Sequence, residues 1–345
     1  MLYAIRSIRE VIMSEVRYNA ITGDWVVIAT ERAKRPEDFT HVKQKKELLA
    51  YVPTCPFCPG CEDKTPSETF HLSDAEGKWT VRSIPNKFSA FSREGDVIKH
   101  RSDSRQFISG VGLHEVIVET PEHNMTTALL PLAHVEQILE MYKNRLIAFY
   151  EDPRIEHVII FKNHGEGAGT SLEHPHSQIV GTPVIPGQVM SRLEEAIRNY
   201  YYVNFGECVY CLCLSNELSD KVRIVGENKS FVAFIPYAAP SPFHLWIFPR
   251  RHVSCFGSIS AEEISDLAAI LKEMLLRLYI GLDNPDFNYM VRSLSPKEAN
   301  SKYFHWYIAI VPRVSQAAGF ELGTGMFINT ALPEESAQFL RNVKI

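Results

Sequence analysis

The segment His174-Pro-His-Ser-Gln178 holds the residues best suited to chemistry in this chain. Side chains alternate between the two faces of an extended strand, so His174, His176 and Gln178 would share one face. A neutral imidazole is nucleophilic near pH 7, and a glutamine amide is an uncharged donor and acceptor. Attack on an α-phosphorus would give a phosphoramidate that can pass a nucleotidyl group onward. The motif therefore predicts chemistry on phosphate.

The segment before this motif, residues 163–171, is rich in glycine and short hydroxyl side chains. Backbone N–H groups in such a loop can approach phosphate oxygens closely. A glycine run alone could be a plain turn. Beside two histidines it favours phosphate binding.

Two Cys-x-x-Cys clusters hold most of the seven cysteines. An odd number of cysteines without a secretory signal indicates reduced thiols in a cytoplasmic protein. A Cys-x-x-Cys turn supplies two thiolates to a tetrahedral zinc ion, and histidines would complete each site. The two predicted ligand sets are Cys55, Cys58, His123 and His174, and Cys208, Cys211, His252 and His305.

Each of these sites would have four protein ligands and no open position for an activated water, so both zinc ions would be structural. The first would also fix the strand that carries His176. Two alternatives remain for the ligands, because Cys61 and Cys213 each form an overlapping pair with the predicted cysteines. The cysteines of the first cluster could also be merely buried.

The order of these features occurs twice along the chain. In each half a cysteine pair is followed by a strand, a histidine, an amphipathic helix, a second strand and another histidine. The helices are expected over about 132–150 and from a capping box at Ser260 and Glu263. This repeat predicts two α+β modules with antiparallel strands, at residues 1–195 and 196–345, whose sheets associate. Only the first has His-x-His, since the second reads His305-Trp-Tyr307, so one active centre per chain is expected.

The composition and charge of the chain argue against several classes of binding partner. The 345 residues carry a formal net charge of -5, which gives no general attraction to nucleic acid or anionic membranes. No apolar run reaches the length of a spanning helix. Charged residues at Arg6, Arg9 and Glu10 interrupt the N-terminal apolar residues, so this stretch is not a signal peptide. Residues 1–12 are interpreted as a dispensable extension before Met13, with a short amphipathic helix as the alternative.

The motif at 174–178 and the order of cysteines and histidines resemble the galactose-1-phosphate uridylyltransferase family, the transferase branch of the histidine-triad superfamily. The resemblance runs from Asp24-Trp25 to the segment 319–325. It implies an α+β fold of duplicated histidine-triad-like modules, with antiparallel sheets flanked by helices. Hydrolytic relatives usually carry a third histidine at the position of Gln178, and glutamine there goes with transfer to a sugar phosphate.

The resemblance also assigns roles to single residues. It implies that His176 is the covalent nucleophile, that Gln178 holds the transferred phosphate, and that the first cysteine and histidine set binds zinc. Arg32 and Arg35 would reach phosphate across the interface of a homodimer, although they could equally be solvated surface residues. Residues implied to contact the nucleotide, its phosphates or the hexose are Asn86, Asn163, Gly169, Ser171, Phe320 and Glu321.

The expected reaction is ping-pong transfer of UMP between UDP-glucose and galactose 1-phosphate. The chain departs from the best-known members, which place metal-binding histidines at the positions of Tyr307 and Ala309 and another near Arg292. The segment Phe320-Glu321-Leu-Gly-Thr-Gly325 also replaces the tyrosine and glutamate that contact the hexose in those members. ADP-glucose phosphorylase, with inorganic phosphate as acceptor, is therefore an alternative. A zinc-stabilised nucleotide-binding protein without chemistry is a second alternative, and a nucleotide hydrolase is a third that Gln178 disfavours.

Overall fold

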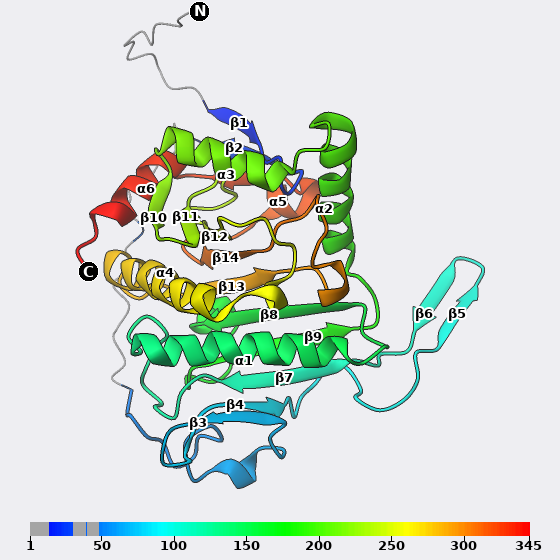
Figure 1. The fold of residues 1–345 in the computed structure, drawn as a ribbon, viewed down its shortest axis with the longest axis vertical. Coiled ribbons are helices and arrows are strands. Elements are labelled where there is room, and N and C mark those ends of the chain that lie inside the picture. The colour runs from blue at the N-terminus through cyan, green and yellow to red at the C-terminus, as the bar shows by residue number, and fades with distance from the viewer. Residues whose placement is uncertain (1–13, 30–38, 40–47) are drawn as a thin grey trace, which may run out of the picture.

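One antiparallel sheet of ten strands organises the computed structural model, which describes residues 14–29, 39 and 48–345 (Figure 1). Every neighbouring pair in this sheet is antiparallel. In spatial order the strands are β10 (Ile224–Glu227), β11 (Phe231–Phe234), β12 (Leu245–Pro249), β14 (Tyr307–Pro312), β13 (Phe287–Arg292), β8 (His157–His164), β9 (His176–Thr182), β7 (Leu113–Val118), β4 (Trp79–Pro85) and β3 (Phe70–Ser73).

The sheet consists of two halves related by an approximate twofold axis at the β8–β13 pair. Each half contributes five strands in the same connectivity. Helix α1 (Leu132–Tyr150) joins β7 to β8, and α4 (Ala261–Gly281) joins β12 to β13 in the same way. The registers agree too, because Val116 lies opposite Gln178 and Trp246 lies opposite Ala309. The expected α+β fold of duplicated antiparallel modules is confirmed. The division into residues 1–195 and 196–345 stays a prediction, and its boundary falls within α2 (Gly187–Arg198).

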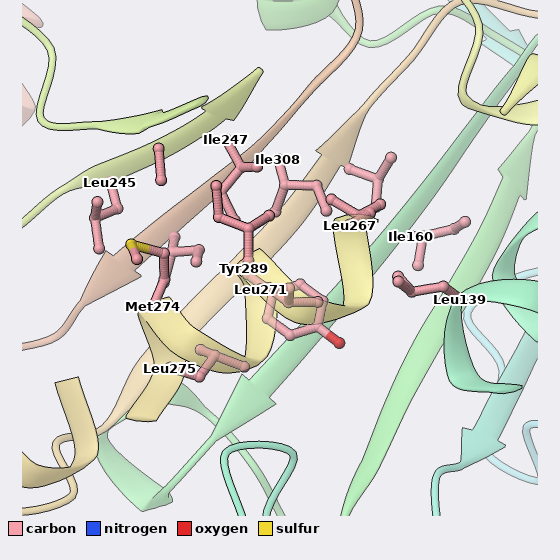
Figure 2. Close-up of a cluster of buried hydrophobic side chains, with 14 of the residues drawn as sticks. Leu139, Ile160, Leu245, Ile247, Leu267, Leu271, Met274, Leu275, Tyr289 and Ile308 are labelled. Carbon is pink, nitrogen blue, oxygen red and sulfur yellow. The ribbon is translucent and has the colours of Figure 1, made fainter. Parts of the chain in front are cut away.

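Helices α1 and α4 lie side by side over one face of the sheet (Figure 1). Both carry apolar residues three and four apart, which places one buried stripe against the strands. The predicted capping box begins α4, since Ser260 Oγ accepts from the Glu263 amide and Glu263 accepts from the Ser260 amide. Figure 2 labels part of the resulting core: Leu139, Ile160, Leu245, Ile247, Leu267, Leu271, Met274, Leu275, Tyr289 and Ile308.

The opposite face of the sheet carries the cysteine segments. Val116 and Val118 of β7 point to this face and pack with Cys55, Phe57 and Cys58. Because side chains alternate along β9, Ile179 faces the helices while His176 and Gln178 face the cysteine side. In the second half α3 (Val209–Asp220) packs on this same face. The chemistry-bearing residues and the main core are therefore separated by the thickness of the sheet.

Smaller elements complete the structure. Strands β1 (Glu15–Tyr18), β2 (Trp25–Ile28) and β15 (Phe327–Asn329) form a three-stranded sheet. The hairpin of β5 (Lys99–Ser102) and β6 (Arg105–Ile108) projects from the body (Figure 1). Two further helices are α5 (Gly319–Thr324) and α6 (Pro333–Asn342).

None of the helices within the described ranges is long and apolar enough to cross a membrane. The predicted extension at residues 1–12, like Arg32 and Arg35, lies outside the described residues.

Candidate active site and metal centres

His176 begins β9 and is only 7% exposed. Its Nδ1 lies 2.8 Å from the carbonyl oxygen of His174. A carbonyl can only accept, so Nδ1 carries the proton and the lone pair is left on Nε2. Burial lowers the pKa of His176, and the nearby Lys162 ammonium acts in the same direction, which favours the neutral ring. The imidazole is thus held in the tautomer that makes Nε2 nucleophilic.

A chain of polar side chains continues from His176 along the same face. The Nε2 atom of His114 lies 2.8 Å from Gln178 Oε1 and 3.0 Å from Asn86 Nδ2. His114 Nε2 either donates to Gln178 Oε1 or accepts from Asn86 Nδ2, and the tautomer that donates to Gln178 would fix the amide and leave its NH₂ group for a phosphate oxygen. Asn86 thus lies near Gln178 through His114, and its implied contact with the nucleotide stays a prediction. The role of His114 was missed, because it follows from the β7–β9 register and not from any local motif.

The glycine-rich segment is held against the second half of the sheet. Asn163 Oδ1 accepts from Asn288 Nδ2 at 2.8 Å, and Gly167 N donates to Asp286 Oδ2 at 2.9 Å. A Cβ atom at Gly165 would lie 1.6 Å from Asp286 Oδ1, and the φ angle there is +84°, so only glycine fits. Gly169 also has a positive φ, and Ser171, two residues further on, is exposed. The loop is fixed in place by a strand more than one hundred residues away in sequence.

The other predicted substrate residues lie elsewhere. Phe320 and Glu321 are on α5, in the second half, and Phe320 is 43% exposed. Glu321 Oε2 accepts from the Ala318 amide at the start of that helix. Among the described residues, no side-chain hydrogen bond or ion pair joins α5 to His176 of the same chain. Their predicted contact with the hexose stays a prediction.

The first predicted metal set is brought together. Cys55, Cys58, His123 and His174 are all buried, and one ligand atom from each lies within 4.8 Å of the others. The recorded Sγ to Nδ1 distances are 3.5–3.7 Å. Tetrahedral zinc with Zn–S near 2.3 Å and Zn–N near 2.0 Å would separate such atoms by about 3.5 Å. His174 Nε2 also contacts the carbonyl oxygen of Thr120 at 2.7 Å, so its Nδ1 is the atom available to a metal. The donor set therefore fits zinc.

The second predicted set is partly assembled. Cys208, Cys211 and His252 form a compact group. The Nδ1 atoms of His252 and His305 lie 3.2 and 3.7 Å from Cys211 Sγ. His252 Nε2 contacts the carbonyl oxygen of Ser301 at 3.0 Å, which again directs Nδ1 to the cysteines. The group thus fits a metal, with His305 beside it as the fourth candidate ligand.

Neither alternative cysteine belongs to these groups. Cys61 Sγ points to the carbonyl oxygen of Pro53 at 3.4 Å and contacts the Lys64 ammonium. Burial raises the pKa of Cys213 to about 12, which keeps this thiol protonated. The geometry favours the Cys-x-x-Cys pairs 55/58 and 208/211.

A buried ion pair supports the backbone of the histidine motif from the helix side. Lys162 Nζ lies 2.5 Å from Glu119 Oε2 and 3.4 Å from the carbonyl oxygen of His176. Glu119 also accepts from Thr127 and Tyr142. Burial opposes ionisation of Glu119, but the Lys162 ammonium and these hydrogen bonds hold its pKa below the usual value. The ion pair thus ties β8 to the start of β9.

Replacing Lys162 with methionine is expected to destabilise the protein by about 3–5 kcal/mol, because Glu119 would remain as an uncompensated buried charge. The free energy of unfolding in urea measures this. Lys229→Met is the control, since its pair with Glu262 is exposed on both sides and surface pairs contribute about 1 kcal/mol or less. If both variants lose the same free energy of unfolding, the buried Lys162 pair contributes no more to stability than an exposed pair.

A buried imidazole with its proton on Nδ1 and a glycine-rich loop, on a duplicated antiparallel sheet, are features typical of a nucleotidyltransferase. A family model described as galactose-1-phosphate uridyl transferase, N-terminal domain, matches residues 4–186, and a model of a domain of unknown function matches residues 119–342. The chain belongs to the galactose-1-phosphate uridylyltransferase family. The expected family is confirmed, and with it the expectation of an enzyme.

Two similar proteins illustrate the range of this family. The ADP-glucose phosphorylase of Arabidopsis thaliana is 35% identical over 335 residues, covering 96% of this chain and 93% of the relative. The galactose-1-phosphate uridylyltransferase of Thermotoga maritima is 29% identical over 343 residues, covering 96% of this chain and 99% of the relative. The crystal structure of the Arabidopsis thaliana ADP-glucose phosphorylase with bound ADP-glucose superposes with a TM-score of 0.80, at 31% identity, covering 96% of this chain and 100% of that one.

Proposed function

We propose that the protein transfers a nucleotidyl group from a nucleoside diphosphate hexose to a phosphate-bearing acceptor, with His176 as the covalent carrier. The observation that carries the proposal is the hydrogen bond from His176 Nδ1 to the carbonyl of His174, which leaves Nε2 as the nucleophile. The preferred substrates are UDP-glucose as donor and galactose 1-phosphate as acceptor. Membership of the family supports this choice.

The reaction has two displacements at the same phosphorus. In the first, the Nε2 lone pair of His176 attacks the α-phosphorus, and the bond to the bridging oxygen breaks. The electron pair leaves with the hexose 1-phosphate, and UMP stays on the ring as a phosphoramidate. In the second, a phosphate oxygen of galactose 1-phosphate attacks the phosphorus. The P–N bond then breaks and its electron pair returns to the imidazole.

Charge on the phosphoryl oxygens is the main quantity that the protein must stabilise in both steps. The amide of Gln178, positioned through His114, is one donor on the same strand face as His176. Backbone N–H groups of the loop around Gly169 are further donors. Because this loop is fixed by Asp286, these groups would be held in place before the substrate binds.

Two structural zinc ions are part of the proposal, one at each cysteine and histidine group. Zinc would supply folding energy and hold the first loop against β7, and it has no role in the displacement. We also propose a cytoplasmic homodimer, in which Arg32 and Arg35 reach the partner's phosphate site, with no nucleic-acid or membrane partner.

A second candidate is ADP-glucose phosphorolysis, in which inorganic phosphate is the acceptor and ADP the product. The specific observation in its favour is the likeness to the ADP-glucose phosphorylase of Arabidopsis thaliana in sequence and in structure. The same histidine chemistry serves both reactions. Only the base and the acceptor differ.

A substrate panel separates these candidates. UDP-glucose and ADP-glucose are each incubated with galactose 1-phosphate, with inorganic phosphate and with no acceptor, and the products are quantified. The uridylyl proposal expects UDP-galactose as the fastest product, whereas the alternative expects ADP from ADP-glucose and phosphate. Steady release of a nucleoside monophosphate without acceptor would indicate a hydrolase. No turnover in any combination would contradict both transfer reactions and leave a binding protein.

A further inference from the structure

A cavity of about 390 Å³ lies in the second half, on the sheet face where His176 lies in the first half. The matching registers identify Ala309 as the counterpart of Gln178 and Tyr307 as the counterpart of His176. His244 precedes Trp246 by two residues, as His114 precedes Val116, so the two histidines are counterparts as well. His244, Trp246, Tyr307 and Ala309 all line the cavity. It is the second copy of the catalytic position, without a nucleophile.

The charged residues that line this cavity have an excess of one positive charge. Arg192 of α2, Arg292 at the end of β13 and Arg313 after β14 line it, against the acidic residues Asp24 and Glu321. No ion pair within the described part of the chain involves any of the three arginines. Burial lowers the pKa of Arg292, and the neighbouring Arg192 acts in the same direction. The two guanidinium groups repel each other across a partly enclosed space, which an anion would relieve.

Three buried polar atoms of residues that line the cavity lack partners, namely Ser241 Oγ, His244 Nδ1 and Arg292 Nε. His244 is 8% exposed, and its Nε2 accepts from Trp246 Nε1 at 3.1 Å. The neutral ring therefore carries its proton on Nδ1, and this buried donor has no acceptor. The Nε atom of Arg292 is likewise buried without a partner, and the one recorded side-chain contact of Arg292 is to Met290 Sδ at 3.5 Å. Buried donors without acceptors are unfavourable, so each of these atoms calls for an acceptor from a bound water or a ligand.

We propose that this cavity binds a phosphorylated small molecule without reacting with it. A phosphate monoester is largely dianionic near pH 7, which matches the charges of Arg192 and Arg292, and guanidinium groups hold phosphate in a bidentate way. A monocarboxylate would leave one of the two arginines uncompensated. Trp246 and Tyr307 offer aromatic surface for a sugar or base, and the volume lies in the usual range of ligand pockets. Binding there is independent of the chemistry proposed for His176.

Calorimetric titration of the full chain with glucose 1-phosphate, inorganic phosphate, UMP and acetate, at matched ionic strength, tests the proposal. We expect the phosphorylated probes to bind at a site that Arg192→Gln and Arg292→Gln each weaken by at least about tenfold. Arg198→Gln, on the same helix but exposed and paired with Glu195, should bind like the parent protein. Comparison of phosphate with the two esters shows whether the organic part adds affinity.

A second readout separates this site from the catalytic one. The amount of nucleotidyl-enzyme formed from UDP-glucose or ADP-glucose is measured by intact mass in the same variants. Loss of phosphate binding with the adduct retained supports a separate site, even if the preferred donor proves different from the proposed one. Arg192→Gln decides the question if Arg292→Gln fails to fold, as judged by its melting temperature. Unchanged binding of the phosphorylated probes in folded Arg192→Gln, or equal binding of acetate, would overturn the proposal.

Discussion

The His176→Ala variant should form no nucleotidyl-enzyme adduct and should lose turnover by at least about 10³-fold, because removal of a covalent nucleophile removes the whole route. The fold should persist, since the ring makes one recorded hydrogen bond, to a neighbouring backbone carbonyl. Intact mass after incubation with UDP-glucose or ADP-glucose gives the adduct. Initial rates with each acceptor give the turnover.

His100→Ala is the matched control for this variant, because His100 is an exposed histidine on the projecting β5–β6 hairpin. It should form the adduct like the parent protein. Tyr307→Phe should do so too, since Tyr307 occupies the counterpart position without being a nucleophile. An adduct that persists in His176→Ala would place the covalent bond on another residue and contradict the mechanism.

The Cys58→Ser variant should lose one zinc per chain and several kcal/mol of stability. Its thiol is fully buried, and its Sγ lies 3.5 and 3.6 Å from the Nδ1 atoms of His123 and His174. Structural zinc contributes on the order of 10 kcal/mol to the folding of small zinc domains. Here the larger hydrophobic core should make the loss of unfolding free energy smaller than that. Metal analysis should give about two zinc per chain in the parent protein and about one in the variant. Urea unfolding measures the stability.

Cys61→Ser provides the comparison within the same loop. Cys61 is buried like Cys58, but its thiol points to the Pro53 carbonyl and not to the histidines. Both zinc ions should be retained. If Cys61→Ser loses zinc and Cys58→Ser does not, the ligand set is wrong, and a parent protein with no zinc would refute the metal proposal altogether.

The sequence indicated those parts of the structure that repeat or follow a period. The helix at 132–150 and the capping box of α4 were predictable, because an apolar stripe and a local hydrogen-bond pattern specify them. The grouping of Cys55, Cys58, His123 and His174, and of Cys208, Cys211 and His252, was predictable because these residue types at this spacing are typical of a zinc site. Zinc itself, and His305 as a ligand, stay predictions.

The remaining site residues depend on strand register, which no local pattern in the sequence specifies. His114 reaches Gln178 only because β7 and β9 pair in one particular register. Asp286 holds the glycine loop only because β13 lies next to β8. The cavity lined by Arg292 and His244 was also not foreseen, since the missing histidines of the second half were interpreted as an absent catalytic centre and as a departure from the family's second metal site. A sequence comparison of the two halves, position by position, would have paired His114 with His244.

The central β8–β13 pair also determines which truncations of the chain the fold can tolerate. A protein truncated before β13 would leave β8 as an open edge, with its row of N–H and C=O groups exposed to solvent. Such an edge recruits strands from other molecules, so a released amino-terminal half would tend to aggregate. During synthesis this edge is uncovered until β13 has left the ribosome. Between the synthesis of those two strands the nascent chain therefore has an unpaired strand edge through which it can aggregate.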